Sequence, residues 1–192
     1  MNTIMIALIE VSKIASIIDL DQAILFYIQT NFHFPVLDEI MIFFTTVGNF
    51  GLIWILLALL LILKKETRYI GVLTLAALLL GIILGEGILK NIIQRPRPFT
   101  DFPSVQLLIN QPSTYAFPSG HTMSSFAAAY VLSKYMNKYS LIIWIVAVTI
   151  AFSRLYLSVH YFSDIIGGIA LGLICGKIVC EIYERKVKKE LS

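Results

Sequence analysis

The chain has 192 residues, of which 58% are hydrophobic and 14% are charged, and its formal net charge is +3. So much apolar sequence excludes a soluble domain of this length, and several apolar runs approach the ~20 residues with which a helix spans a bilayer. The runs are continuous, which excludes the alternating pattern of a transmembrane barrel, and the small net charge gives no indication of a nucleic-acid partner. We expect an all-α integral membrane bundle of about five to six transmembrane helices.

The N-terminal region, residues 1–37, is less regular than the rest. Residues 1–18 are apolar but contain Glu10 and Lys13, which fits a short first span or an interfacial helix; we favour an interfacial or tilted helix. Residues 19–35 carry several polar side chains and end in a proline, so they predict a second short amphipathic piece that ends in a turn.

The helical core is predicted over residues 38–183, followed by a basic tail at 184–192. The stretch 91–117 is loop-like, because four of the six prolines of the chain fall in it. Glycines four residues apart within the spans are typical of helices that approach closely in lipid. They are Gly81 with Gly85, and Gly168 with Gly172 and Gly176. The predicted spans are 38–63, 68–90, 118–135, 140–158 and 162–183.

The basic residues are distributed unequally between the two sets of turns. Nine lie on one set, which the positive-inside rule assigns to the cytoplasm: Lys64, Lys65, Arg68, Lys134, Lys138, Arg185, Lys186, Lys188 and Lys189. Four lie on the opposite set: Lys90, Arg95, Arg97 and Arg154. Three polar clusters share this second side, so we expect a site on the extracytoplasmic surface.

The first cluster is K-N-I-I-Q-R-P-R-P, residues 90–98. A guanidinium offers a planar fork of donors suited to phosphate oxygens, and an ammonium offers a compact charge, so Lys90 and Arg97 are candidates for anion binding. Basic residues beside a span are more often interfacial anchors, and we assign Arg95 to that class. Glu86 lies one helical turn before Lys90 and is expected to pair with it.

The second cluster, F-P-S-G-H-T at residues 117–122, precedes an apolar helix. Proline, serine and glycine are typical of a helix N-terminus, where free N–H groups and the helix dipole favour an anion. Ser119 adds a hydroxyl, Gly120 lets a ligand approach the backbone, and His121 can transfer a proton near neutral pH.

The third cluster is S-R-L-Y-L-S-V-H-Y-F-S-D, residues 153–164. Arg154 supplies a further cation for an anion. His160 and Asp164 are four residues apart, so on a helix the carboxylate can hold the imidazole, as in covalent catalysts with an oriented nucleophile. An ordinary ion pair that caps the last span is the alternative for these two residues.

A metal site is a rival interpretation, since His121, His160 and Asp164 could form a two-histidine, one-carboxylate site. Three cations from the same clusters would then repel the metal, whereas they attract a phosphate. We therefore favour a phosphate site over a metal site.

The three clusters together resemble the type 2 phosphatidic acid phosphatase superfamily, which also includes vanadium-dependent haloperoxidases. The signature of that family is K-x6-R-P, P-S-G-H and S-R-x5-H-x3-D. All eleven specified positions are present: Lys90, Arg97, Pro98, Pro118, Ser119, Gly120, His121, Ser153, Arg154, His160 and Asp164.

The resemblance implies a phosphatase that needs no metal or other cofactor. His160 would attack phosphorus and form a phosphohistidine, Asp164 would orient His160, and His121 would protonate the leaving oxygen. The groups that the resemblance assigns to the phosphate oxygens are Lys90, Arg97, Ser119, the Gly120 N–H and Arg154.

A site at the membrane surface, in a chain with no soluble module, predicts a lipid phosphate as substrate and the bilayer as its surroundings. The residues do not select among undecaprenyl diphosphate, phosphatidylglycerol phosphate and phosphatidate; we favour the first two equally. Phosphoryl transfer to another acceptor, and binding or transport of a phospholipid without cleavage, are the alternative functions.

Overall fold

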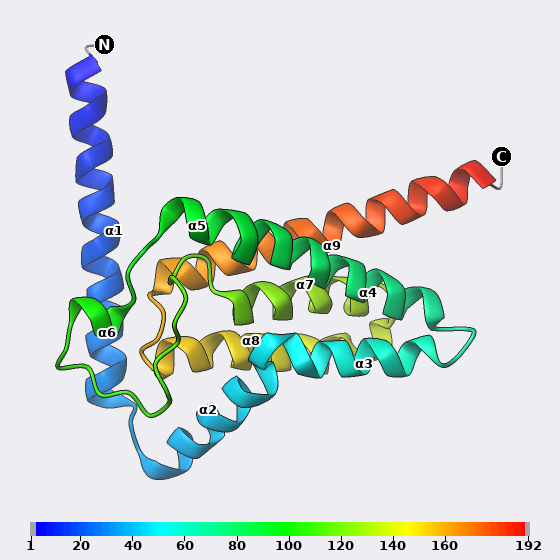
Figure 1. Ribbon diagram of the computed structural model, residues 1–192, viewed down its shortest axis with the longest axis horizontal. Helices are drawn as coiled ribbons and strands as arrows, with labels where there is room; N and C mark the ends of the chain where they lie inside the picture. Colours follow the sequence, from blue (N-terminus) through cyan, green and yellow to red (C-terminus); the bar gives the residue numbers. More distant parts are fainter. Residues whose placement is uncertain (1–2, 191–192) are drawn as a thin grey trace.

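The structure, a computed structural model, describes the backbone of residues 3–190 and the side chains of residues 16–190. Over this range the regular structure is entirely helical, as the apolar runs predict. Figure 1 shows a bundle of helices that is crossed at one end by the N-terminal helix. The elements are α1 (Thr3–Asn31), α2 (Pro35–Gly48), η1 (Asn49–Gly51), α3 (Leu52–Ile62), α4 (Arg68–Gly81), η2 (Ile82–Leu89), α5 (Lys90–Ile93), α6 (Pro98–Asp101), α7 (Gly120–Tyr135), η3 (Asn137–Tyr139), α8 (Ser140–Tyr156) and α9 (Phe162–Glu190).

Helix α7 forms the centre of the bundle and packs against α4, α8 and α9. Its side chains from Thr122 to Ala129 are all buried, and they are small or apolar. Four segments of the described chain are long and apolar enough to cross a membrane, and all four contact α7. They cover residues 35–62, 68–101, 137–156 and 162–190.

Helix α1 is continuous, whereas the sequence predicted separate pieces at 1–18 and 19–35. That prediction was wrong because Asp21, which suggested a break, is buried in an ion pair instead of facing water. The chain turns only just before Pro35, which begins α2 at a position where no backbone N–H is needed. Helix α1 crosses the end of the bundle (Figure 1). Residues 1 and 2 of the predicted first piece lie outside the described residues.

The predicted span 38–63 is correct in extent but not continuous. Helix α2 ends at Gly48, and the next residues include Phe50 and Gly51 with positive φ values of 54° and 68°. Two successive residues with left-handed backbone end a right-handed helix, and glycine adopts this conformation readily. Helix α3 then resumes, and the break itself contacts α7.

The predicted span 68–90 is confirmed as α4 and η2, and the helix continues through α5 to Ile93. The element η2 is a π-helix, a wide turn that is frequent at functional sites. Gln94 has a φ of 47° and ends the helix. The loop predicted for 91–117 is confirmed from residue 94 onward, except for the single turn of α6.

The helices predicted at 118–135, 140–158 and 162–183 are present as α7, α8 and α9, and α8 and α9 belong to segments long and apolar enough to cross a membrane. Helix α9 is longer than predicted and continues to Glu190, so most of the basic tail is helical. Residues 191 and 192 of the tail lie outside the described residues.

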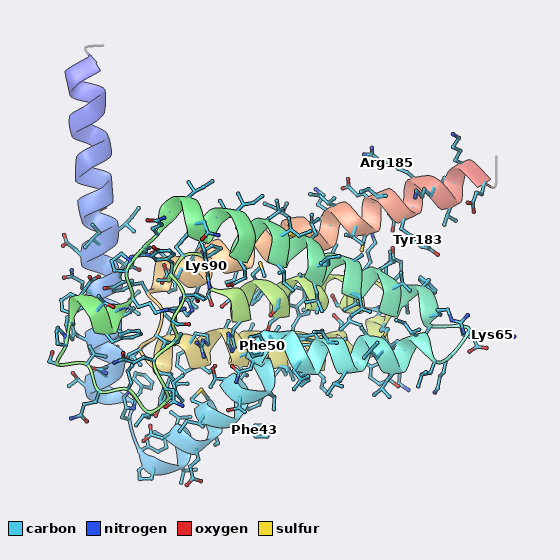
Figure 2. All side chains as sticks on the ribbon, in the orientation of Figure 1. Phe43, Phe50, Lys65, Lys90, Tyr183 and Arg185 are labelled. Carbon is cyan, nitrogen blue, oxygen red and sulfur yellow. The ribbon has the colours of Figure 1, made fainter. Side chains whose placement is uncertain are left out.

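The two ends of the bundle differ in the residues they carry. The start of α7, the end of α8, the start of α9 and the end of α5 lie at one end, and the turn between α3 and α4 lies at the other (Figure 1). Figure 2 shows Lys90 near the first end and Lys65 at the second. The predicted gathering of the three polar clusters at one end of the bundle is therefore confirmed.

Glycines on α9 let it lie directly on α7, as their spacing predicts. A methyl group at Gly172 would be 2.5 Å from the Met123 carbonyl oxygen, and one at Gly168 would be 2.8 Å from the Ser119 oxygen. Both distances are too short for a carbon and an oxygen that are not bonded. The close approach is useful to the site because α7 and α9 each carry part of it.

Gly172→Val is expected to destabilise the fold by about 1 to 3 kcal/mol, the usual cost of forcing bulk into a packed interface. The measurement is the midpoint of thermal unfolding in detergent. Gly87→Ala is the matched control, because a methyl group at Gly87 would meet nothing closer than 3.8 Å. Equal midpoints for the two variants would show that the α7–α9 contact does not depend on glycine.

Candidate active site

A cavity of about 900 Å³ lies where the three polar clusters meet. Its walls come from α2, η1, α4, η2, α5, α7 and α8, together with the loop before α7. The three cations that line it outnumber the carboxylates, of which the lining contains one. The ionisable residues of the lining are Glu86, Lys90, Arg97, His121, Arg154 and His160.

Lys90 stands on the first turn after the π-helix and is buried despite its charge. Its Nζ lies 2.9 Å from the Glu86 carboxylate and 3.2 Å from the Thr114 hydroxyl. The predicted pairing with Glu86 is therefore confirmed. Because the carboxylate also lines the cavity, an anion that enters must compete with Glu86 for the ammonium.

Arg97 is held rigidly by the backbone around it. Its Nε donates to the Thr114 carbonyl at 2.6 Å, and its Nη1 donates to the Val159 carbonyl at 2.7 Å. Its Nη2 also reaches the Thr114 hydroxyl and the Tyr115 carbonyl. Only a guanidinium has enough donors in one plane to make these contacts, and its positive charge remains beside the cavity.

His160 lies between Arg97 and Asp164, and these two neighbours decide where its proton sits. Arg97 Nη1 is 3.3 Å from His160 Nε2, and Asp164 Oδ2 is 3.4 Å from His160 Nδ1. A guanidinium can only donate, so Nε2 must present its lone pair, and the proton is on Nδ1 facing the carboxylate. Nε2, the unprotonated nitrogen, is therefore on the side of the cations.

The environment of His160 also keeps its ring uncharged. Complete burial lowers the pKa of His160 well below its usual value, and the nearby charges of Arg97, Arg154 and Lys90 lower it further. The ring is therefore neutral at pH 7 and stays neutral in mildly acidic solution. A neutral imidazole is the form that can act as a nucleophile.

Arg154 lies in the last turn of α8 and is buried, with 3% of its surface exposed. Its Nη1 donates to the Thr45 hydroxyl. Its Nε is buried and has no hydrogen-bond partner among the described residues. A buried guanidinium donor without an acceptor is costly, so this atom indicates where an anion would bind.

The start of α7 has the predicted form of a capped helix N-terminus. Ser119 is its N-cap, and the Ser119 Oγ accepts from the Thr122 N–H at 3.5 Å and from its hydroxyl at 3.0 Å. Ser119 is fully buried and lies behind the lining, whereas Gly120 reaches the cavity. A methyl group at Gly120 would be 2.3 Å from the Glu86 Oε1, so a side chain there would require the Glu86 carboxylate to move.

His121 follows on the first turn of α7 and lines the cavity. Its Nε2 is 3.2 Å from the Thr45 carbonyl oxygen and 2.9 Å from the Asn49 Oδ1. A carbonyl can only accept, so Nε2 carries a proton. The break between α2 and α3 is what brings Asn49 to this ring.

Arg95 does not have the role that we assigned to it from the sequence. It is not an interfacial anchor: its Nη1 donates to Asp164 Oδ1 at 2.6 Å and its Nη2 donates to Asp21 Oδ2 at 2.7 Å. The prediction failed because Asp21 is far away in the sequence and in a different helix. The sequence signal for this pair was the charge of Asp21 among apolar residues, which indicates a buried partner but does not identify it.

Other polar residues of the site were also missed. Thr45 and Asn49 lie four residues apart in the predicted span 38–63, where polar residues on one face could have suggested a lining. Thr114, which contacts both Lys90 and Arg97, comes from an irregular loop whose sequence has no periodicity to interpret.

Asp164 uses both of its carboxylate oxygens as hydrogen-bond acceptors. Its two oxygens are directed at Arg95 and at His160. Among the described residues, no three histidine, cysteine or acidic side chains are grouped so that they could hold a metal ion. The arrangement can hold a phosphate group against a neutral imidazole, with a second histidine beside it.

Two relatives with known names are similar to this chain in sequence. An undecaprenyl-diphosphatase of Sulfolobus acidocaldarius is 34% identical over 137 residues, which are 71% of this chain and 66% of that protein. Phosphatidylglycerophosphatase B of Bacillus subtilis is 34% identical over 113 residues, covering 53% of this chain and 52% of that protein. The chain thus spans between about half and two thirds of the length of these two relatives.

Two solved structures have the same architecture. A transmembrane PAP2 type phosphatidylglycerolphosphate phosphatase from Bacillus subtilis has a TM-score of 0.73 and 30% identity, covering 88% of this chain and 87% of that one. LpxE from Aquifex aeolicus has a TM-score of 0.72 and 28% identity, covering 85% and 94%. Residues 65–188 match the PAP2 superfamily, and they contain all three motifs of the site. With its apolar helices, this chain is a multi-pass membrane protein that belongs to the PAP2 superfamily.

Proposed function

We propose that this protein is a lipid phosphate phosphatase that hydrolyses the phosphate or diphosphate of a membrane lipid through a phosphohistidine on His160. The observation that carries the proposal is the pairing of His160 with a cation on one nitrogen and a carboxylate on the other. This pairing leaves a neutral imidazole whose unprotonated nitrogen, Nε2, is on the side where three cations would hold a phosphate.

In the first step the Nε2 of His160 attacks phosphorus, and the bond between phosphorus and the leaving oxygen breaks. The imidazolium that forms keeps its Nδ1 proton directed at Asp164, which stabilises the new charge. His121, protonated on both ring nitrogens while the phosphate is bound, gives one proton to the leaving oxygen and becomes neutral. The alcohol, or the lipid monophosphate if the substrate is a diphosphate, then departs.

In the second step water attacks the phosphohistidine, and the nitrogen–phosphorus bond breaks. His121, now neutral, accepts a proton from the water. Inorganic phosphate leaves and His160 returns to its neutral form. In both steps Lys90, Arg97 and Arg154 stabilise the charge on the equatorial oxygens, assisted by the Gly120 N–H at the start of α7, which Ser119 caps from behind the lining.

A lipid substrate is supported by the lining of the cavity. Beside the charged groups lie apolar side chains that suit the hydrocarbon next to a phosphate, including Phe50, Leu78, Ile82, Leu108 and Met123. The relatives are named for undecaprenyl diphosphate and for phosphatidylglycerophosphate. Both lipids are therefore the first substrates to compare.

The site is proposed to face outside the cytoplasm. Nine of the basic residues belong to turns and a tail assigned to the opposite side by the positive-inside rule. An accessibility assay with a membrane-impermeant thiol reagent tests this: a cysteine at Lys65 should be protected in intact cells, and a cysteine at Leu108 should react. The reverse pattern would place the site in the cytoplasm.

The activity is expected to survive chelation and to be blocked by vanadate, which resembles phosphate in its transition-state geometry. The measurement is phosphate release by purified protein from undecaprenyl diphosphate, phosphatidylglycerol phosphate and phosphatidate, with and without a chelator. Complete loss of activity with the chelator, restored by a divalent metal, would contradict the proposed chemistry. Binding of a lipid phosphate without phosphate release would show a binding or transport protein, and phosphate found on an added alcohol would show a transferase.

A further inference from the structure

The N-terminal helix contributes one buried charge to the neighbourhood of the site. Asp21 of α1 is 2% exposed, although it lies outside residues 65–188, which match the family. Its Oδ1 accepts from the Ser163 N–H at 2.8 Å, and its Oδ2 accepts from the Ser163 hydroxyl at 2.5 Å and from Arg95 at 2.7 Å. A buried carboxylate is costly unless it is paired, and the partners of Asp21 are all at Ser163 and Arg95, beside Asp164.

Arg95 links this carboxylate to the one that faces the candidate nucleophile. Its Nη1 donates to the Ser163 hydroxyl and to Asp164 Oδ1, both at 2.6 Å. Its guanidinium lies over the Tyr161 ring, 4.4 Å from the ring centroid. With Asp21 bound to Nη2, the guanidinium is held on three sides. This also fixes the position of Asp164 Oδ1, to which it donates.

The bond between Asp164 and His160 depends on that position. Asp164 accepts from Arg95 at 2.6 Å, from the Tyr161 N–H at 2.8 Å and from His160 at 3.4 Å. The contact with His160 is the longest of the three, so a small rotation of the carboxylate removes it first. Anything that releases Arg95 therefore acts on the orientation and the tautomer of His160.

We propose that Asp21 and Arg95 are positioning residues for catalysis: α1 holds Arg95, Arg95 holds Asp164, and Asp164 holds His160. The inference rests on the proposed function of His160. It means that catalysis also requires the N-terminal helix α1 and Arg95, which is not one of the motif positions. A tether that only anchors α1 to the bundle would need the Asp21 contacts but not the contact between Arg95 and Asp164.

Several charged or titratable groups lie around Asp164 and influence the pH at which its carboxylate gains a proton. Asp21 comes from α1, Arg95 and Arg97 come from the segment between α5 and α6, and His160 and Tyr161 come from the turn before α9. Asp101 of α6 accepts from the Tyr161 hydroxyl at 2.7 Å. Replacement of Arg95 by a neutral residue removes the cation nearest to Asp164 and so favours its protonated form, which cannot accept from His160.

The experiment measures kcat, KM and the pH profile of phosphate release for Asp21→Asn, Arg95→Met, Arg95→Lys and the double variant. We expect kcat to fall about 10-fold for Asp21→Asn and about 100-fold for Arg95→Met, the range typical of residues that orient a functional ligand, with little change in KM. Arg95→Lys should restore part of the loss. The acidic limb of the Arg95→Met profile should move to higher pH, and the double variant should be no worse than Arg95→Met.

Asp19→Asn is the matched control, because Asp19 is exposed on the same helix, and it should behave as the wild type. Thermal unfolding and the folded yield are measured for every variant. Wild-type kcat and pH profile in the folded fraction of Asp21→Asn and Arg95→Met would overturn the proposal and leave a structural tether. His160→Ala, assayed in parallel, separates this outcome from a failure of the proposed function, since an active His160→Ala would contradict that function whatever Asp21 does.

Discussion

His160→Ala is expected to lower phosphate release by about 10³-fold to 10⁶-fold, the range seen when the nucleophile of a covalent catalyst is removed. The reason is geometric: among the described residues that line the cavity, the His160 imidazole is the one neutral nucleophile that a carboxylate orients and a guanidinium faces. The measurement is the initial rate of phosphate release from a lipid phosphate under saturating conditions.

Loss of activity in His160→Ala must be distinguished from loss of the site. The cations remain in this variant, so vanadate or inorganic phosphate should still raise its unfolding temperature. A variant that keeps this protection and loses turnover supports a chemical role for His160. Turnover at the wild-type rate would assign the nucleophile elsewhere.

Arg97→Lys is expected to lower kcat/KM by about 10²-fold to 10³-fold, comparable to the removal of one donor that stabilises transition-state charge. The substitution keeps the charge but loses the planar fork, and with it the bonds to the Thr114 and Val159 carbonyls. His160 would also lose the donor that keeps its lone pair on Nε2. The loss should appear in kcat more than in KM.

The matched control for this substitution is Arg185→Lys, because Arg185 is 82% exposed at the far end of α9. It should leave the kinetic constants unchanged. If Arg97→Lys stays within about threefold of the wild type, a point charge is sufficient at this position and the role of the fork is refuted.

The chemistry of the site could be predicted from the sequence because it is encoded locally. Each cluster carries its functional groups within about ten residues, and the apolar spans between the clusters determine which ends of the helices meet. The close contact of α7 with α9 was also predictable, since Gly172 and its neighbours repeat every four residues.

The supports of the site could not be predicted in the same way. Asp21 and Arg95 are 74 residues apart, and neither belongs to a pattern that points to the other. The break at Phe50 and Gly51 is marked in the sequence only by Gly48 and Gly51, although it brings Asn49 to His121. These features depend on how distant helices pack, which neither periodicity nor residue type reveals.

The most direct test of the account is to look for the covalent intermediate. The protein is mixed with a lipid phosphate labelled with ³²P in the phosphate, quenched within milliseconds in alkali, where phosphohistidine is stable, and digested for mass spectrometry. The account predicts a burst of label, attached to His160 and absent from His160→Ala. Steady-state turnover with no labelled protein, or with the label on another residue, would contradict it.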